Sequence, residues 1–384
     1  MKKKLVVGVD IRDLRIAKTG TGTYLKELCR EFKALENEDL QFHFFDTGME
    51  VYTGEIKVRK LVEHLKLQVW KHLQLPFKAW HKRCDIVFCT DNIVPLVHLG
   101  YKTIPVIHDA FFFENPEHYN RIWLWAYKNL AIPAAKRSAF VITPTNYATD
   151  RIHHYTGIGK EKLVAIAEGP KSFELQEDQN GTSSKILNEF DFERRDYILH
   201  VGLMDKRKNI PALIYAFKKL EEDGYTGKLV LVGKADSIKL NNDSLAVKNA
   251  IKQTKLEDKI IITGYLSDKD LAKVYSGALL YVFPSLNEGF GIPILEAFKY
   301  KLPVLVADNT CLPEVGGDAV LTFDPKNPDD IFRKMKLVVE DKGLREDLIT
   351  RGSIRLKQFS WEKAAKELVE VFKKADELNR YKSK

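Results

Sequence analysis

Residues 283–296 read Phe-Pro-Ser-Leu-Asn-Glu-Gly-Phe-Gly-Ile-Pro-Ile-Leu-Glu, and this stretch decides the fold of the chain. The apolar run at 279–283 that leads into it predicts a buried strand, which stops at Pro284. A turn containing Ser, Asn and Gly follows. Pro293 suits the first turn of a helix, which we predict over residues 294–300. The stretch therefore predicts a strand, a turn and a helix in immediate succession.

Two carboxylates in this stretch can accept hydrogen bonds from hydroxyl groups. Glu288 lies in the turn, and Glu296 lies one turn into the helix. The backbone N–H groups at the start of the helix, around Gly289 and Gly291, favour an anionic or hydroxyl-rich ligand. One carboxylate could hold a sugar and the other a ribose. The alternative is that Glu288 caps the loop and Glu296 only complements the helix dipole.

The same alternation of strand and helix runs through the whole chain and predicts parallel sheets that are covered on both faces. The 384 residues contain two such series, on either side of a polar segment at 175–184. We therefore expect an α/β protein with two Rossmann-like, doubly wound domains, at residues 1–178 and 186–360. Strands are predicted at 4–10, 41–45, 85–89, 103–107, 140–143 and 163–167, and then at 197–201, 229–232, 260–263, 279–283 and 303–307.

The composition, with 45% hydrophobic and 30% charged residues, is that of a soluble globular protein. Four cysteines without CxxC spacing indicate a reducing compartment. No apolar run approaches the ~20 residues of a membrane span. The run after Lys4 ends at Asp10, which is too early for a signal peptide. These features favour a cytoplasmic protein.

The formal net charge of +8 favours an anionic partner, which could be a phosphate group, a lipid surface or a nucleic acid. No nucleic-acid motif and no aromatic-basic repeat accompanies this charge, so we expect no nucleic-acid partner.

Residues 56–83 predict a basic amphipathic helix. It contains eight Lys and Arg residues and a single acid, Glu63. Such a helix can lie on an anionic membrane surface. It can equally pack its apolar stripe on the sheet under a solvated basic face, and both interpretations stay open. The stripe consists of Val58, Leu61, Val62, Leu65, Val69 and Leu73.

The loop after the predicted strand at 197–201 carries a second set of candidate residues, Gly202 to Asn209. Arg207 and Lys208 lie side by side before a predicted helix. The planar guanidinium of an arginine beside the mobile ammonium of a lysine is well suited to bind a diphosphate. An isolated Arg-Lys pair is more often simply part of the surface.

Two features of the first half also suit a ligand. His108 and Asp109 close the predicted strand at 103–107, and ligands bind at the carboxyl ends of strands in a doubly wound sheet. A histidine there can also be a purely structural hydrogen-bonding group. Gly20 and Gly22 let the backbone approach a ligand before a helix, but their spacing is not the dinucleotide pattern, and a plain capped helix is the alternative.

Together these motifs resemble those of the retaining family 4 glycosyltransferases, also described as glycosyl transferases group 1. The Glu288-x7-Glu296 pair with Gly-Phe-Gly-Ile-Pro between its members is similar to their donor-binding motif. The turn at Gly20 and Gly22 and the His108-Asp109 pair also match. Further matches are the basic loop after Gly202, the Gly264-Tyr265-Leu-Ser loop, and Pro313-Glu314-Val-Gly-Gly-Asp. Many members carry Arg directly after the first glycine of the basic loop, where this chain has Leu203, and Arg207 is the expected replacement.

The resemblance implies the GT-B fold, in which two Rossmann-like domains face an interdomain cleft and the C-terminal helix, here 361–384, returns to the first domain. It implies transfer of a hexose, with mannose as the first candidate, from a nucleotide diphosphosugar to a hydroxyl acceptor with retention of configuration. The expected catalytic residues are Lys208, Arg207, Glu288 and His108. The residues expected to bind the nucleotide sugar are Gly20, Gly22, Gly202, Gly264, Tyr265, Gly289, Phe290, Gly291, Ile292 and Glu296.

The partners implied are GDP-mannose first and a UDP-sugar second, with a glycan or lipid-linked acceptor in surface polysaccharide synthesis. The protein is then expected in the cytoplasm, peripherally on the inner face of an anionic membrane. No metal and no cofactor are expected, because no Asp-x-Asp motif lies near the proposed site and the basic clamp can neutralise the diphosphate. The alternatives are a sugar-nucleotide epimerase on the same fold and a non-catalytic nucleotide-sugar-binding protein.

Overall fold

The computed structural model contains two compact units, residues 1–169 with 360–384 and residues 170–359. It describes residues 3–16, 20–48, 51–52, 56–173, 192, 195–233 and 242–382. The whole segment expected as a linker, 175–184, therefore lies outside the described residues. The chain passes from the first unit to the second between Gly169 and Pro170, earlier than the boundary expected between 178 and 186.

The first unit is built on parallel strands in the order β2-β1-β3-β4, and β5 and β6 form a two-stranded continuation. A bridge between Val106 and Ile142 connects the two groups. The order 2-1-3-4 is that of a flavodoxin-like sheet. The strand order of such a sheet reverses between β1 and β3, although all its strands run parallel. The strands are β1 (Leu5–Asp10), β2 (Leu40–Phe45), β3 (Ile86–Cys89), β4 (Lys102–Pro105), β5 (Val141–Thr143) and β6 (Leu163–Ala165).

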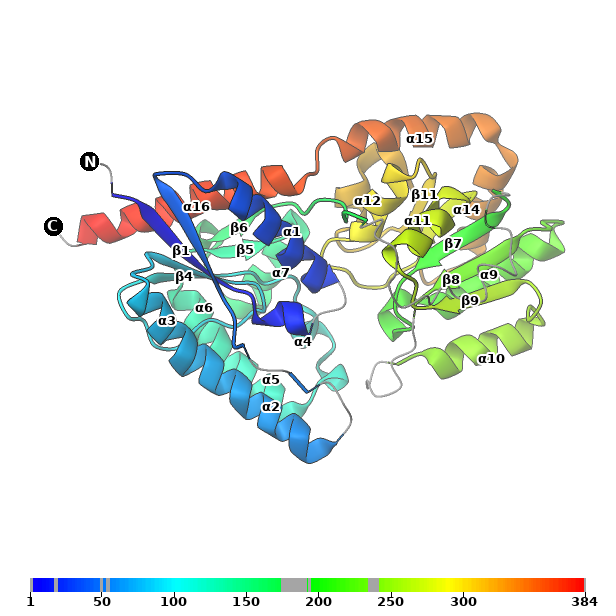
Figure 1. Cartoon of the computed structure of the whole chain (residues 1–384). Helices are drawn as coiled ribbons and strands as arrows, with labels where there is room; N and C mark the ends of the chain where they lie inside the picture. Colours follow the sequence, from blue (N-terminus) through cyan, green and yellow to red (C-terminus); the bar gives the residue numbers. More distant parts are fainter. Residues whose placement is uncertain are drawn as a thin grey trace. The chain divides into compact units, whose positions relative to one another are not determined.

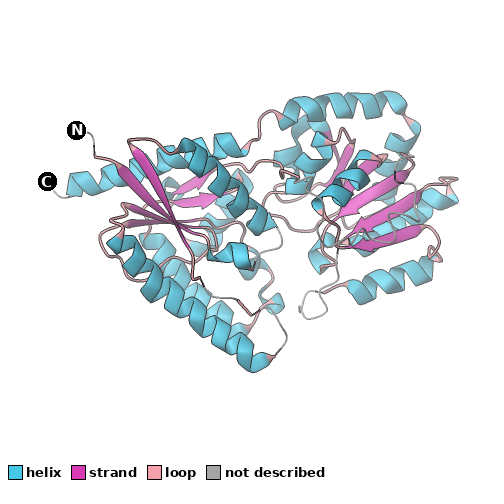
Figure 2. Cartoon of the chain, viewed as in Figure 1, coloured by secondary structure: helices cyan, strands magenta, loops and turns pink. Residues whose placement is uncertain are grey.

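Helices lie on both sides of the strands in each unit (Figure 2). Those of the first unit include two π-helical turns, η2 and η4, which continue neighbouring α-helices without a break. The helices are η1 (Arg12–Arg15), α1 (Gly20–Leu35), α2 (Lys57–Val69), η2 (Trp70–Gln74), α3 (Leu75–His81), α4 (Phe111–Glu114), η3 (Pro116–His118), α5 (Arg121–Ala126), η4 (Tyr127–Ala131), α6 (Ile132–Arg137), α7 (Asn146–Thr156) and η5 (Lys160–Lys162).

The last helix of the chain, α16 (Trp361–Lys382), packs against α1, β1 and β3 of the first unit, as the family resemblance implied (Figure 1). Its buried residues recur at intervals of three and four, which places them on one face of the helix. Phe372 contacts Phe32 of α1 and Phe88 of β3, with ring centroids 6.0 and 5.4 Å away.

The second unit is a six-stranded parallel sheet in the order β12-β11-β10-β7-β8-β9. This is the Rossmann order 3-2-1-4-5-6, and the point where the strand order reverses lies between β7 and β10. Ligands bind outside the carboxyl ends of the strands at such a point. The strands are β7 (Tyr197–Val201), β8 (Lys228–Val232), β9 (Ile260–Gly264), β10 (Leu280–Phe283), β11 (Val304–Ala307) and β12 (Val320–Phe323).

All eleven strands predicted from the sequence are present, most with ends shifted by one or two residues, whereas β12 was not predicted. The helix predicted at 294–300 begins two residues earlier, because Gly291 caps it with φ 101° and Pro293 fits inside its first turn. The helices are η6 (Lys206–Lys208), α9 (Ile210–Glu222), α10 (Ser244–Thr254), α11 (Asp268–Ser276), α12 (Ile292–Lys299), α13 (Leu312–Gly316), η7 (Gly317–Ala319), α14 (Pro328–Glu340) and α15 (Lys342–Leu356).

Candidate active site

The two loops that carry the main candidate residues lie next to each other at the switch point of the second unit. One follows β7 and the other follows β10, and these strands are neighbours in the sheet. The backbone N–H of Leu286 donates to the carbonyl of Arg207 at 2.7 Å. The side-chain amide of Asn209 donates to the carbonyls of Pro284 and Pro325, at 3.2 and 2.7 Å. Backbone and side-chain contacts therefore fix both loops before any ligand binds.

Lys208 and Glu288, predicted independently from the two loops, form an ion pair. The Nζ atom of Lys208 lies 2.5 Å from Oε1 of Glu288, and it also lies 5.0 Å from the centre of the Phe283 ring. Both side chains are nearly buried, with 12% and 11% of their surface exposed. Burial alone would raise the pKa of Glu288, but the charges of Lys208 and Arg207 hold it below its ordinary value. Glu288 is therefore an ionised carboxylate.

Gly202 and His200 make the space in which Lys208 lies. A Cβ atom added at Gly202 would lie 3.3 Å from Cε of Lys208 and 3.2 Å from Nε2 of His200. His200 is completely buried, its Nδ1 lies 3.0 Å from the carbonyl of Val282, and burial lowers its pKa to about 4. The ring is therefore neutral and adds no second positive charge. Sequence reasoning missed His200, although a polar residue within an apolar strand was a signal.

Arg207 lies in the same turn as Lys208 but is held differently. Its Nε atom lies 3.3 Å from Oδ1 of Asp205, and this carboxylate also caps the turn by accepting from the Arg207 N–H at 2.9 Å. The guanidinium further donates to the carbonyl of Asn287 at 3.4 Å. The structure thus brings the predicted basic pair and Glu288 together at one place.

Glu296 lies inside the second unit and is bonded to a tyrosine that the sequence did not single out. The hydroxyl of Tyr275 on α11 donates to Oε2 of Glu296 at 2.7 Å. Burial raises the pKa of Glu296. Burial raises the pKa of Tyr281, and the charges of Glu296 and Glu288 raise it further. Tyr281 therefore lies close to both predicted glutamates. The two carboxylates therefore share one neighbourhood.

Some predicted residues of the second unit do not present side chains to a ligand. Phe290 is buried against Phe359, with ring centroids 6.0 Å apart, and Ile292 is buried as well. Only the backbone of these two residues is suited to contact a donor. The burial of these side chains follows from packing, because apolar side chains in a turn over a sheet are drawn into the core. Tyr265, in contrast, is 71% exposed, next to Gly264 at the end of β9.

In the first unit, His108 lies in a polar and aromatic setting after β4. Its Nε2 lies 3.1 Å from the carbonyl of Thr90, and its Nδ1 lies 3.6 Å from Oε1 of Glu168. The ring meets that of Tyr24 edge to face at 5.1 Å, and Tyr24 in turn contacts Trp361 of α16 at 5.5 Å. Burial opposes the charged form of His108, but Glu168 and Asp109 outweigh it and raise the pKa. The imidazolium form therefore persists to a higher pH than in a free histidine.

Gly20 and Gly22 do not lie in a turn ahead of a helix, because α1 already begins at Gly20. Gly22 is buried in the first turn of that helix. The residues directly before Gly20, 17–19, lie outside the described residues.

A buried charge cluster lies at the switch point of the first unit. The ammonium of Lys71 on η2 lies 2.5 Å from Oδ2 of Asp10 and 2.5 Å from Oδ1 of Asp91. Trp70 donates from Nε1 to the other oxygen of Asp10 at 3.0 Å. Lys71, expected on the solvated basic face of a helix, is therefore only 1% exposed. Its burial is possible because two carboxylates compensate its charge.

The same cluster is the group of side chains in the described part of the chain whose spacing could suit a metal ion. The ligand atoms of Asp10, Cys89 and Asp91 lie within 4.8 Å of one another. The ammonium of Lys71 already contacts both carboxylates, and burial raises the pKa of the Cys89 thiol. A neutral thiol beside a resident lysine is a poor set of ligands for a divalent cation.

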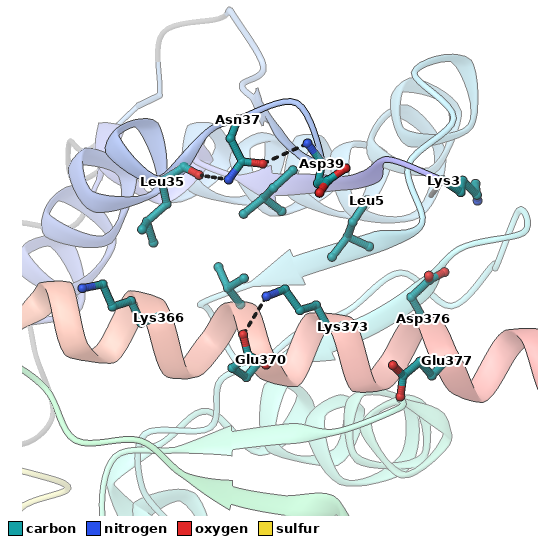
Figure 3. Close-up of a pocket in the computed structure, with 12 residues that line it drawn as sticks. Lys3, Leu5, Leu35, Asn37, Asp39, Lys366, Glu370, Lys373, Asp376 and Glu377 are labelled. Carbon is teal, nitrogen blue, oxygen red and sulfur yellow. Dashed lines mark hydrogen bonds and ion pairs between the residues drawn. The ribbon is translucent and has the colours of Figure 1, made fainter. Parts of the chain in front are cut away.

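A pocket of about 370 Å³ lies at the opposite edge of the first sheet from these residues. It is lined by Leu5 and Leu40, the first residues of β1 and β2, and by one face of α16 (Figure 3). Lys373 and Glu370, which also line it, are paired with each other at 2.7 Å. The pocket contains none of the predicted site residues and lies at the amino ends of the strands, away from the edge where ligands bind.

Comparison with known proteins agrees with this geometry. The family model described as "Glycosyl transferases group 1" matches residues 184–355. Over 372 residues the chain is 27% identical to O-antigen chain mannosyltransferase B of Escherichia coli, covering 92% of this chain and 96% of that protein. The structure resembles sucrose-phosphate synthase from Thermosynechococcus elongatus, with a TM-score of 0.73 and 16% identity over 97% and 99% of the two chains. It also resembles Anabaena HepE in complex with UDP-glucose, with a TM-score of 0.70 and 14% identity over 96% and 100%.

Proposed function

We propose that this chain, which has the GT-B fold and carries a glycosyl transferases group 1 domain at residues 184–355, moves a hexose from a nucleotide diphosphosugar to a hydroxyl group of a glycan or lipid-linked acceptor. We propose GDP-mannose as the first candidate donor and a UDP-sugar as the second. The name of the Escherichia coli relative favours mannose and the synthesis of a surface polysaccharide, whereas the Anabaena protein binds UDP-glucose.

The observation that carries this proposal is the Lys208–Glu288 ion pair at the switch point of the second sheet. Breaking the bond between the sugar and the diphosphate leaves negative charge on the leaving group. Fixed cations in a partly buried place stabilise such charge more than they would in water. Lys208 and Arg207 supply them, and the amino end of α12 behind Gly291 adds its dipole.

Glu288 and Glu296 have separate roles in this proposal. Glu288 is ionised and accepts hydrogen bonds from hydroxyls of the sugar that is transferred. Glu296 binds the ribose through the carboxylate oxygen that does not contact Tyr275. The backbone of Gly202, Gly264 and residues 289–292 contacts the rest of the donor.

We propose that the sugar is transferred with retention of its anomeric configuration. An inverting transferase needs a base that removes the proton of the acceptor hydroxyl. Glu288 is a weak base because the charges of Lys208 and Arg207 lower its pKa. An oxygen of the departing diphosphate can take the proton on the same face of the sugar instead.

The donor can be identified by a thermal-shift screen over GDP-mannose, UDP-sugars and free nucleotides. We expect one nucleotide to raise the unfolding temperature of the wild type and not that of Lys208→Ala. Turnover of the stabilising donor, followed by NMR of the product's anomeric proton, then tests both transfer and retention. Binding without turnover would favour the non-catalytic alternative, and inverted product would overturn the retaining scheme. Neither the family match nor the Escherichia coli relative supports the epimerase alternative.

We further propose that the reaction needs no metal, because Lys208 and Arg207 can neutralise the diphosphate. Initial rates measured with excess EDTA and after dialysis against chelating resin should equal those of the untreated enzyme. A rate that falls on chelation and returns with magnesium or manganese would contradict this part of the proposal.

A further inference from the structure

The helical segment α2-η2-α3 of the first unit presents a line of exposed apolar side chains. They are between 43% and 71% exposed, although each is large and hydrophobic. The sequence left open whether the stripe of this helix packs on the sheet, and the structure shows that its described members do not. The line, which we name the apolar line, consists of Val58, Val62, Leu65, Val69, Leu73, Phe77 and Trp80.

The π turn keeps the apolar line straight. From Val58 to Val69 the members recur at steps of four, three and four, which matches an α-helix. The next two steps, to Leu73 and to Phe77, are both four residues long, and in a regular α-helix they would drift around the axis. The π-helical turn at 70–74 holds about one residue more than an α turn. It therefore absorbs the drift and brings Phe77 and Trp80 back into line.

The opposite face of the segment already makes the core contacts that a helix needs. Trp70, Leu75 and Ala79 are completely buried and belong to the core cluster that also contains Val87 and Cys89 of β3. The buried Lys71 pairs with Asp10 and Asp91 on the same side. The segment is therefore fixed on the first unit by one face, and the apolar line is a second, separate hydrophobic surface.

The charges around the apolar line are positive. Arg59, Lys82 and Arg83 are exposed near its ends. The single acid of the segment, Glu63, is largely buried and pairs with Lys66 at 2.7 Å and with Arg12 at 3.9 Å. Its negative charge therefore does not offset the exposed basic residues.

We propose that the apolar line docks onto an anionic lipid bilayer, with the helix axis in the plane of the interface and Phe77 and Trp80 among the headgroups. Apolar residues on one face, basic residues beside them and aromatic residues at one end are the features that hold a helix at such an interface. No helix in the described ranges is long and apolar enough to cross a membrane, so this contact is peripheral. The surface deepens the proposed function, on which its role in reaching a lipid-linked acceptor rests.

Electrostatics favours a bilayer over a second copy of the chain. Two copies joined through the apolar line would bring the exposed basic residues of both into one interface, which is unfavourable because Glu63, the acid of the described segment, is already paired within its own chain. An anionic leaflet instead attracts each of these residues.

Vesicle sedimentation tests the surface. We expect the full chain to bind vesicles that contain phosphatidylglycerol and to bind pure phosphatidylcholine vesicles more weakly. Leu73→Glu should lower the partition coefficient roughly tenfold or more, because it removes a leucine that would be buried in the bilayer and adds a negative charge that the anionic lipids repel. Leu245→Glu, at a comparably exposed leucine on α10 of the second unit, is the matched control and should bind like the wild type. Equal binding of both variants, or no binding of the wild type to anionic vesicles, overturns the proposal.

Tryptophan fluorescence gives a second, local readout. Entry of Trp80 among the headgroups should shift its emission to shorter wavelength when anionic vesicles are added. The shift should disappear in Trp80→Phe and persist in Trp125→Phe, which changes another exposed tryptophan of the same unit. A shift that survives in Trp80→Phe contradicts docking through the apolar line.

Two further measurements separate this proposal from the catalytic one. Lys208→Ala should lose turnover and still sediment with vesicles, whereas Leu73→Glu should bind the donor normally in the thermal-shift assay. Analytical ultracentrifugation tests the competing partner. A dimer that is abolished by Leu73→Glu, together with absent vesicle binding, would assign the apolar line to a second copy instead.

Discussion

Lys208 and Glu288 are 80 positions apart in the sequence, yet Nζ of the one lies 2.5 Å from Oε1 of the other. The pair means that the cation proposed to receive the diphosphate already has a partner before the donor arrives. Donor binding therefore exchanges part of one charge interaction for another, and Glu288 becomes available for the hydroxyls of the sugar. The pair also keeps a nearly buried lysine from being an uncompensated charge.

Lys208→Ala should lower kcat by about 10²–10³-fold, because the leaving group then loses its closest positive charge. Glu288 also loses the charge that holds its pKa down. The control is Lys206→Ala, which removes an exposed lysine from the same turn and should keep nearly full turnover. Steady-state rates of both variants, with circular dichroism to confirm folding, make the comparison. Similar losses in both variants would remove Lys208 from its proposed role.

Glu296→Gln should weaken nucleotide binding by about tenfold or more, since a charge-assisted hydrogen bond contributes roughly 1.5–3 kcal/mol. Tyr275→Phe is the comparison, because it removes the hydroxyl that contacts the same carboxylate but leaves the charge in place. Calorimetric titration with the free nucleotide should show the larger loss for Glu296→Gln. Unchanged affinity in that variant would show that Glu296 only holds α11 against α12.

The stability of the first unit should depend on the ionisation of His108. Its pKa is raised in the folded state from an ordinary value of 6.5. The stabilisation from its charged form is therefore fully present below pH 6.5 and is lost as the pH rises through the higher folded pKa. The difference in unfolding free energy between wild type and His108→Gln should shrink over that range. Glu168→Gln removes the partner that raises the pKa and should flatten the wild-type curve. A difference that stays constant with pH contradicts the assignment.

Gly233→Ala should destabilise the second unit by more than about 2 kcal/mol. Gly233 has φ +147°, and an added Cβ would lie 1.8 Å from the carbonyl oxygen of Gly202, so the substitution combines strain with overlap against a backbone atom. Gly224→Ala is the control for strain alone, because Gly224 has φ +103° and no atom within 4 Å of the added Cβ. It should cost about 1–2 kcal/mol. Thermal unfolding of both variants tests the difference, and equal losses would show that the overlap relaxes freely.

The sequence predicted eleven of the strands and assigned both Lys208 and Glu288 to one candidate site, for a simple physical reason. Apolar runs bounded by turn residues give buried strands, and residues that follow neighbouring parallel strands meet at one edge of the sheet. A motif gives the position of a residue and not the direction of its side chain, so it could not show that the side chains of Phe290 and Ile292 are buried. The strand β12 was missed; it lies at the edge of the sheet and half of its residues are partly exposed, so it lacks the continuous apolar run that predicts a buried strand.

The environment of Lys71 could not be predicted from local sequence. Its partners Asp10 and Asp91 are 61 and 20 positions away, and its neighbours in the chain make it look like part of a solvated basic face. The exposure of the apolar line was hidden for a related reason. A stripe at helical spacing shows that one face is hydrophobic, but another face of the same helix supplies the core contacts here.

The position of α16 has a consequence for how the protein is made. Residues 360–384 complete the first unit, whose other residues are all translated before Pro170. While the second unit is being synthesised, Tyr24 therefore lacks its contact with Trp361, and Phe32 and Phe88 lack Phe372. This hydrophobic surface of the first unit therefore stays uncovered in the nascent chain until α16 has emerged from the ribosome. During synthesis the second unit can thus close its core before the first.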